Sequence, residues 1–102
     1  MASLLVLYRT PTDPAAFDAH YRSHHIPLAQ ALPGLRGFEI SQGPVATPAG
    51  PSGVYMIATL RFDDMAAIQA AFASPEGQAA AADVASFATG GAEMMMFDDR
   101  PA

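Results

Sequence analysis

Residues 4–8 of the chain read Leu4-Leu5-Val6-Leu7-Tyr8, an apolar run in which no polar side chain alternates with the apolar ones. The run ends at Arg9-Thr10-Pro11 and is typical of a β-strand. Near the other end of the chain, Met94-Met95-Met96-Phe97 is also apolar throughout, and residues 54–60 are interrupted only by Thr59. An antiparallel sheet with one face in water alternates apolar and polar positions, so these runs predict a sheet that is apolar on both faces.

Between the apolar runs at residues 4–8 and 54–60 the sequence predicts a helix and a strand. Asp13 can cap a helix over residues 14–25, and Pro14 suits its first position, where a missing N–H costs nothing. Pro27 disfavours helical geometry at the residue before it, so the helix is expected to end there, with one further turn over residues 29–34. The remaining elements follow from caps, spacing and composition: a strand at 35–42, a Pro- and Gly-rich loop at 43–53, a strand at 54–62, helices after Asp63-Asp64 and Ser74-Pro75-Glu76, a helix stop near Gly90-Gly91, and a strand at 92–97.

The order β-α-β-β-α-β, with an extra helix before the last strand, predicts an α+β ferredoxin-like fold. In this fold a four-stranded antiparallel sheet carries its helices on one face. At 102 residues the chain has room for a single domain, residues 1–102. The helices can cover only one of the two apolar faces. Leaving about four large side chains wet would cost roughly 8 kcal/mol, which is comparable to the stability of a small domain.

We therefore expect a sheet-to-sheet homodimer; the alternative is a monomer whose long loop folds over the sheet.

All five cations are arginines, they are scattered along the chain, and the formal net charge is −5. A nucleic-acid interface needs a clustered basic face, so none is expected. No apolar stretch approaches the roughly 20 residues that span a bilayer, no cysteine is present, and the first residues lack a positive leader. A cytoplasmic protein whose partners are a second copy and a small organic ligand is expected.

The segment Phe17-Asp18-Ala19-His20-Tyr21-Arg22-Ser23-His24-His25 holds all three histidines of the chain. At 100° per residue, Phe17, Tyr21 and His24 share one stripe of a regular helix, with His20 and His25 on its flanks. Polar groups on a core-facing stripe need partners or a ligand.

Two interpretations of these groups stay open. In one, His25 shuttles a proton and the Tyr21 phenol holds a carbonyl or hydroxyl oxygen, with His20 beside them. In the other, the histidines bond backbone carbonyls and Tyr21 packs with its hydroxyl at the rim. His20 and His24 stand four residues apart, but no glutamate inside the motif and no third ligand accompany them, so no metal is expected. No glycine-rich phosphate loop is present either, and no cofactor is expected.

Several of these motifs together are similar to those of the EthD family, named for ethyl tert-butyl ether degradation and grouped with the dimeric α/β-barrel proteins. They are Tyr8-Arg9, Asp13-Pro14-x-x-Phe17, Tyr21-x-x-x-His25-x-Pro27-Leu28-Ala29, Pro33-Gly34-Leu35-Arg36-Gly37, Ser74-Pro75-Glu76-Gly77-Gln78 and Asp83-Val84. The resemblance implies a ferredoxin-like subunit, a dimeric α/β barrel, and a small oxygenated molecule in the cleft of each subunit. It implies that Tyr21 and His25 are pocket groups and that Arg36 contacts an anion or a carbonyl. We expect Tyr21 and His25 to be catalytic, and Tyr8, His20 and Arg36 to contact the substrate.

The leading hypothesis is a cofactor-independent enzyme with isomerase-, cyclase- or monooxygenase-like proton-transfer chemistry in catabolism or secondary metabolism. One alternative is a non-catalytic binding or accessory protein of a degradation pathway that uses the same cleft. Another is a purely structural dimer whose cleft is plugged by Tyr55, Phe62 and Met94.

Overall fold

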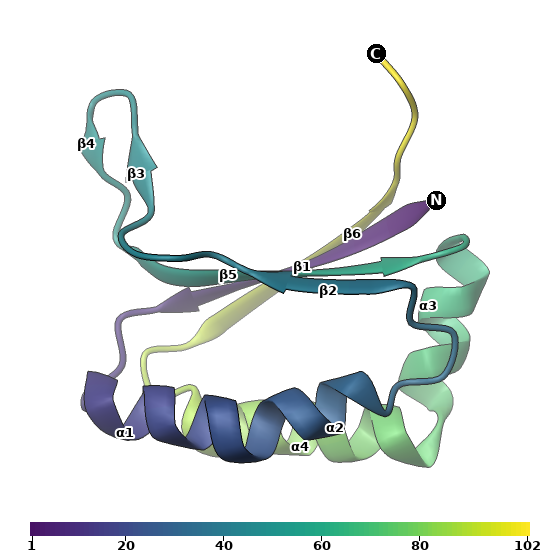
Figure 1. The fold of residues 1–102 in the computed structure, drawn as a ribbon, viewed down its shortest axis with the longest axis horizontal. Coiled ribbons are helices and arrows are strands. Elements are labelled where there is room, and N and C mark those ends of the chain that lie inside the picture. The colour runs from purple at the N-terminus through teal and green to yellow at the C-terminus, as the bar shows by residue number, and fades with distance from the viewer.

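The computed structural model describes residues 1–102 and places them in two layers, a sheet and a layer of helices that covers one of its faces (Figure 1). The sheet is antiparallel and has the strand order β2-β5-β1-β6. The predicted α+β class and ferredoxin-like order are confirmed, including the additional helix before the last strand. The elements are β1 (Ala2–Arg9), α1 (Pro14–His20), η1 (Tyr21–His25), α2 (Ile26–Gln30), β2 (Gly37–Ile40), β3 (Ala46–Thr47), β4 (Gly50–Pro51), β5 (Val54–Phe62), α3 (Met65–Ala73), α4 (Pro75–Phe87) and β6 (Ala92–Asp98).

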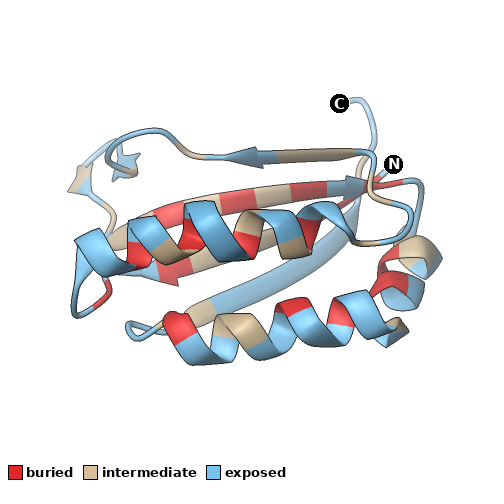
Figure 2. Ribbon diagram, turned by 60° about the horizontal axis from the view of Figure 1, so that its bottom comes forward, coloured by how far each residue is buried: buried red, intermediate tan, exposed pale blue.

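The register of β1 separates the two faces of the sheet. Val6 lies opposite Ala58 on β5 and opposite Met94 on β6, and all three side chains point to the helical side because paired residues share a face. The helix-facing residues of β1 and β5 are buried, and they alternate with half-buried ones along each strand (Figure 2). The core therefore lies between the sheet and the helices.

The opposite face of the sheet is apolar in its middle and uncovered. Its apolar side chains belong to Leu5, Leu7, Ile57, Met95 and Phe97. Met95 is 48% exposed and Phe97 is 43% exposed. Two ion pairs lie on the same side, Arg9–Glu93 with a nitrogen–oxygen distance of 2.7 Å and Arg61–Glu39 with one of 3.1 Å. The predicted two-sided apolar sheet is thus present within the single chain.

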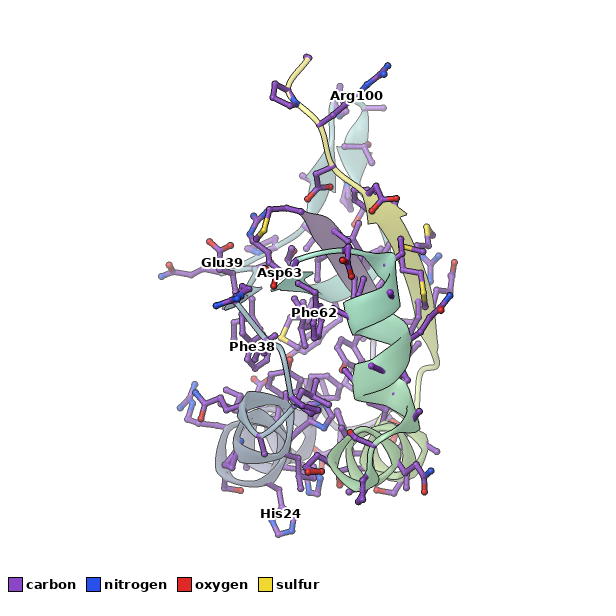
Figure 3. The ribbon with its side chains drawn as sticks, turned by 90° about the vertical axis from the view of Figure 1, so that its right-hand side faces the viewer. His24, Phe38, Glu39, Phe62, Asp63 and Arg100 are labelled. Carbon is purple, nitrogen blue, oxygen red and sulfur yellow. The ribbon has the colours of Figure 1, made fainter.

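The loop predicted at residues 43–53 contains a two-stranded hairpin, β3 and β4. The hairpin does not lie across the bare face: it projects from the end of the sheet, on the side opposite the helices (Figure 1). The C-terminal tail with Arg100 extends on that side as well (Figure 3). A loop folded over the sheet, the alternative to a dimer, is not what the chain adopts.

The first helical segment starts where the sequence predicts, with the Asp13 carboxylate accepting the N–H of Ala16 at 3.1 Å. The prediction that it ends before Pro27 was wrong, because α1, η1 and α2 run on continuously to Gln30. Between α1 and α2 the chain makes a wide π-helical turn, in which the N–H of Ile26 bonds the carbonyl of Tyr21. Proline lacks an N–H, and its ring clashes with the carbonyl four residues earlier in a regular helix; a wider turn directly before it relieves that clash.

The other two helices follow their predicted caps. Asp64 accepts the N–H of Ala67 at 2.8 Å, and Ser74 accepts the N–H of Gly77 at 3.0 Å. A Cβ at Gly77 would lie 1.9 Å from the carbonyl oxygen of Ala71, so α3 and α4 approach so closely there that only glycine fits. None of the helices has both the length and the apolar character needed to cross a membrane.

Candidate active site

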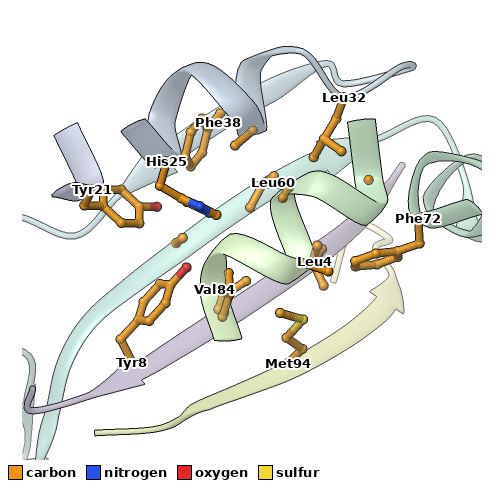
Figure 4. A pocket seen from close by; sticks show the side chains of 16 residues that line it. Leu4, Tyr8, Tyr21, His25, Leu32, Phe38, Leu60, Phe72, Val84 and Met94 are labelled. Atoms are coloured by element: carbon orange, nitrogen blue, oxygen red, sulfur yellow. The ribbon is translucent and has the colours of Figure 1, made fainter. Parts of the chain in front are cut away.

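A cavity of about 40 Å³ lies between the sheet and the helices. Fourteen of its sixteen lining residues are hydrophobic, so a ligand inside it would be held mainly by apolar contacts. Its walls come from β1, β2, β5, β6, η1, α2, α3, α4 and the loop after α2. Its lining includes Leu4, Tyr8, Tyr21, His25, Leu32, Phe38, Leu60, Phe72, Val84 and Met94 (Figure 4).

The polar groups of the cavity gather at one end. Tyr8 enters from β1, and Tyr21 and His25 enter from η1, so two phenols and an imidazole point into the same region (Figure 4). Three of the five predicted site residues are therefore brought together. Such a group at one end of an apolar cavity would orient a ligand by its oxygen atom.

The π-helical turn decides which histidine faces this cavity. A regular helix would put His24 on the stripe of Phe17 and Tyr21, but His24 is exposed and points away from the molecule (Figure 3). His25 is buried instead, with 5% of its surface exposed. The prediction that His24 shares the inner stripe was wrong, because one extra residue in the wide turn delays the inward position from 24 to 25.

His25 is held by a carboxylate on the opposite helix. Its Nδ1 lies 2.9 Å from Oδ2 of Asp83, and the two side chains are only 7% and 11% exposed. A carboxylate accepts hydrogen bonds, so Nδ1 carries the proton and the lone pair of Nε2 is left for a ligand. Burial lowers the pKa of His25 and outweighs the opposing effect of the Asp83 hydrogen bond, which leaves a neutral imidazole that can accept a proton at pH 7.

Asp83 also binds His20, whose Nε2 lies 2.9 Å from Oδ1. Burial acts to raise the pKa of the Asp83 carboxyl, but the hydrogen bonds from His20 and His25 outweigh it and the pKa is lowered. His20 does not line the cavity, and its side chain is 33% exposed. The interpretation in which these histidines bond backbone carbonyls is therefore wrong for both: each bonds a carboxylate.

Sequence reasoning did not assign Asp83 to the site. A signal was available: Asp83 is the sole charged residue between Gly77 and Phe87, and it lies three residues after Ala80 on the buried side of α4. Gly77, Ala80 and Phe87 are the buried residues of that helix. A carboxylate on the buried stripe of an otherwise apolar helix needs a partner, and the histidines of the facing segment are the natural ones.

The two phenols are enclosed by aromatic rings. Tyr21 stacks on Phe17 with ring centroids 5.9 Å apart and meets Tyr8 edge-on at 5.7 Å. Burial raises the pKa of Tyr8 and of Tyr21, so both remain protonated donors at neutral pH. The Tyr21 hydroxyl is buried and has no hydrogen-bond partner, which contradicts the interpretation that it lies at the rim. An unsatisfied buried hydroxyl costs about 1–3 kcal/mol, and a ligand oxygen would remove that cost.

Arg36, the remaining predicted contact, lies outside the cavity. Its guanidinium forms two hydrogen bonds with the Asp63 carboxylate, at 3.0 and 3.1 Å, and its side chain is 60% exposed. Neither Tyr55 nor Phe62 plugs the cavity, and the Tyr55 hydroxyl bonds Asp18 at 2.9 Å. Met94 does reach the cavity wall.

Comparison with known proteins places the chain in a family. The EthD domain matches residues 9–91. An EthD family protein from Bacillus halodurans has a TM-score of 0.89 and 34% identity over 98% of this chain and 99% of its own. A Rhodococcus erythropolis protein, described as an uncharacterized 11.0 kDa protein in the thcB-thcC intergenic region, is 44% identical over 97% of this chain and 95% of its own length.

SnoaB from Streptomyces nogalater, described as a cofactor-independent oxygenase, shares the fold with a TM-score of 0.71. It is 16% identical over 99% of this chain and 94% of its own. At that identity the likeness concerns the fold alone, whereas the domain match covers most of the chain and the Bacillus halodurans protein is similar over nearly its whole length. The chain therefore belongs to the EthD family.

Proposed function

We propose that the protein is an enzyme without a cofactor that moves a proton on a small oxygenated organic compound held in the cavity. The observation that carries the proposal is the arrangement at the polar end of the cavity: a buried His25 oriented by Asp83, beside a Tyr21 hydroxyl that lacks a partner. The description of SnoaB as a cofactor-independent oxygenase supports the view that this fold can act without a cofactor.

In the proposed reaction, Nε2 of His25 takes a proton from a carbon next to a carbonyl group. The electron pair of the broken bond moves onto the carbonyl oxygen, and the phenols of Tyr8 and Tyr21 donate hydrogen bonds to the oxyanion. The positive charge that develops on His25 is stabilised by the Asp83 carboxylate through Nδ1–H. Return of the proton to another carbon gives an isomer. Alternatively, the carbanion attacks a second carbonyl and closes a ring, and the alkoxide that forms takes the proton back from His25.

The test compares two adjacent histidines. A panel of phenols, quinones and lactones is incubated with the protein, in air and under nitrogen, and conversion is followed by mass spectrometry. His25→Ala should lower turnover at least about 100-fold, because general-base catalysis contributes on that scale. His24→Ala, which changes an exposed ring, should leave it unchanged. Equal turnover in both variants would reject His25 as the base, and binding without conversion would support the non-catalytic alternative.

We also propose that a second copy covers the bare sheet face. The face has an apolar centre that includes Met95 and Phe97, and the Arg9–Glu93 and Arg61–Glu39 ion pairs lie on the same side, which resembles the apolar core and polar rim of a protein interface. The projecting hairpin and C-terminal tail, which extend on the same side, would flank the second copy (Figure 1). Contact between two such faces would leave the cavity of each subunit on its own helical side.

A further inference from the structure

The cavity, as it stands in the structure, is too small to hold an organic ring. One water molecule needs roughly 10–15 Å³ on this measure, so about 40 Å³ has room for about three. Part of the wall must move before a ring-sized compound can reach Tyr21 and His25.

Ten of the sixteen lining residues are buried, four are half-buried (Leu32, Phe38, Phe72 and Val84), and two, Ala81 and Met94, are exposed. The two exposed residues lie on α4 and β6, so we place the opening of the cavity between this helix and this edge strand. Ala81 has no side-chain torsion that could open a passage. Met94 has three rotatable bonds and is 41% exposed, so it can swing outward at little cost. In Figure 4 its side chain points from β6 toward Val84 of α4.

We propose that Met94 is the gate of the cavity and the residue that sets the size of its ligand. Outward rotation of the side chain opens the passage between α4 and β6, and inward rotation closes it behind the ligand. The ligand class that fits is a flat apolar ring compound with one hydroxyl or carbonyl group at its leading end. That group would reach Tyr8, Tyr21 and His25, while the ring would lie among Leu4 and the other apolar walls. The inference rests on the proposed function only for the location of the site.

Met96 provides a matched control on the same strand. It follows Met94 by two residues, points to the same side of the sheet, and is 39% exposed, compared with 41% for Met94. It does not line the cavity. A change at Met96 therefore reproduces the change in strand propensity and surface hydrophobicity without touching the passage.

The experiment measures binding of phenol and of 1-naphthol to the full chain and to four variants. These are Met94→Ala, Met94→Phe, Met96→Ala and Met96→Phe. The chain has no tryptophan, so naphthol fluorescence can be followed by stopped flow without background from indole. Met94→Ala should speed naphthol association and shift the affinity ratio toward naphthol, each by about tenfold, and Met94→Phe should do the opposite. Both Met96 variants should match the parent chain.

Equal effects at Met94 and Met96 would overturn the gate. Failure of the parent chain to bind either probe would overturn the ligand class. The readout is binding, so the gate and the proposed chemistry are tested separately. Binding of both probes with the expected dependence on Met94, without conversion of any compound, would refute the enzymatic proposal and support the gate. Thermal unfolding of each variant checks that the fold is retained.

Discussion

Asp83→Asn tests the centre of the site without requiring a known substrate. The carboxylate of Asp83 binds the buried His25 ring at 2.9 Å and the partly exposed His20 ring at 2.9 Å. A hydrogen bond to a charged group contributes about 1.5–3 kcal/mol, and the one to His20 contributes less because solvent screens it. An asparagine oxygen can still accept one of the two bonds. The free energy of unfolding at pH 7 should therefore fall by about 2 kcal/mol, which lowers Tm by roughly 8–16 °C in a domain of this size.

The sharper readout is the tautomer of His25. With a carboxylate facing Nδ1, the proton is held there; an asparagine can turn its NH₂ group toward the ring, so that Nδ1 loses its proton and Nε2 gains one. Nitrogen-15 NMR of the imidazole at pH 7.5 should show an unprotonated Nε2 in the parent chain and a protonated fraction in Asp83→Asn. A protonated Nε2 in the parent chain would refute the reasoning.

Turnover provides the functional check on the same variant. Asp83→Asn should lower it by about 100-fold or more, because His25 then presents an N–H where a lone pair is needed. Asp63→Asn is the control, since this exposed carboxylate pairs with Arg36 outside the cavity. Equal activity of both variants would remove Asp83 from the mechanism.

Three further results are expected. Tyr21→Phe removes a buried hydroxyl that has no partner, so the free energy of unfolding in urea should rise by about 1 kcal/mol while affinity for 1-naphthol falls; a less stable variant would contradict this. Burial lowers the pKa of His25, so the unfolded chain binds more protons below about pH 6.5. Stability should then decline with falling pH by up to about 1.4 kcal/mol per unit until the lowered pKa is reached, and His25→Gln should lose this slope. Leu5→Asp on the bare sheet face should give a monomer in light scattering at micromolar concentration, whereas Ala79→Asp on the exposed side of α4 should not.

The fold could be predicted because its signals are local. The continuous apolar runs of β1 and β6 indicate a sheet with two apolar faces, and the caps at Asp64 and Ser74 mark the helix starts within a residue. The passage of the helix through Pro27 could not be predicted in the same way. A π-helical turn has no propensity signal of its own, and it is stabilised by what its side chains pack against.

The site could be predicted in part for a related reason. Tyr21 and His25 belong to one short segment, so their shared helix face could be predicted from the sequence. The regular-helix pattern placed His24 rather than His25 at the centre of that face, one residue too early. Asp83 lies 58 residues from His25, and only the packing of two helices brings them together. Arg36 was assigned by resemblance rather than by any contact, and the structure pairs it with Asp63 instead.

The π-helical turn also bears on how this segment tolerates length changes. The turn holds one residue more than a regular helix would, and its surplus lies in the exposed positions Arg22 to His24. Deleting Ser23 would therefore shorten the segment to a regular helix, and Tyr21 and His25 would keep their inward orientation. The deletion would destabilise the helix at Pro27, because the proline ring would then clash with the carbonyl of the preceding turn. Adding a residue there would instead rotate everything downstream. The inward orientation of Tyr21 and His25 thus tolerates the loss of one residue from this segment but not the gain of one.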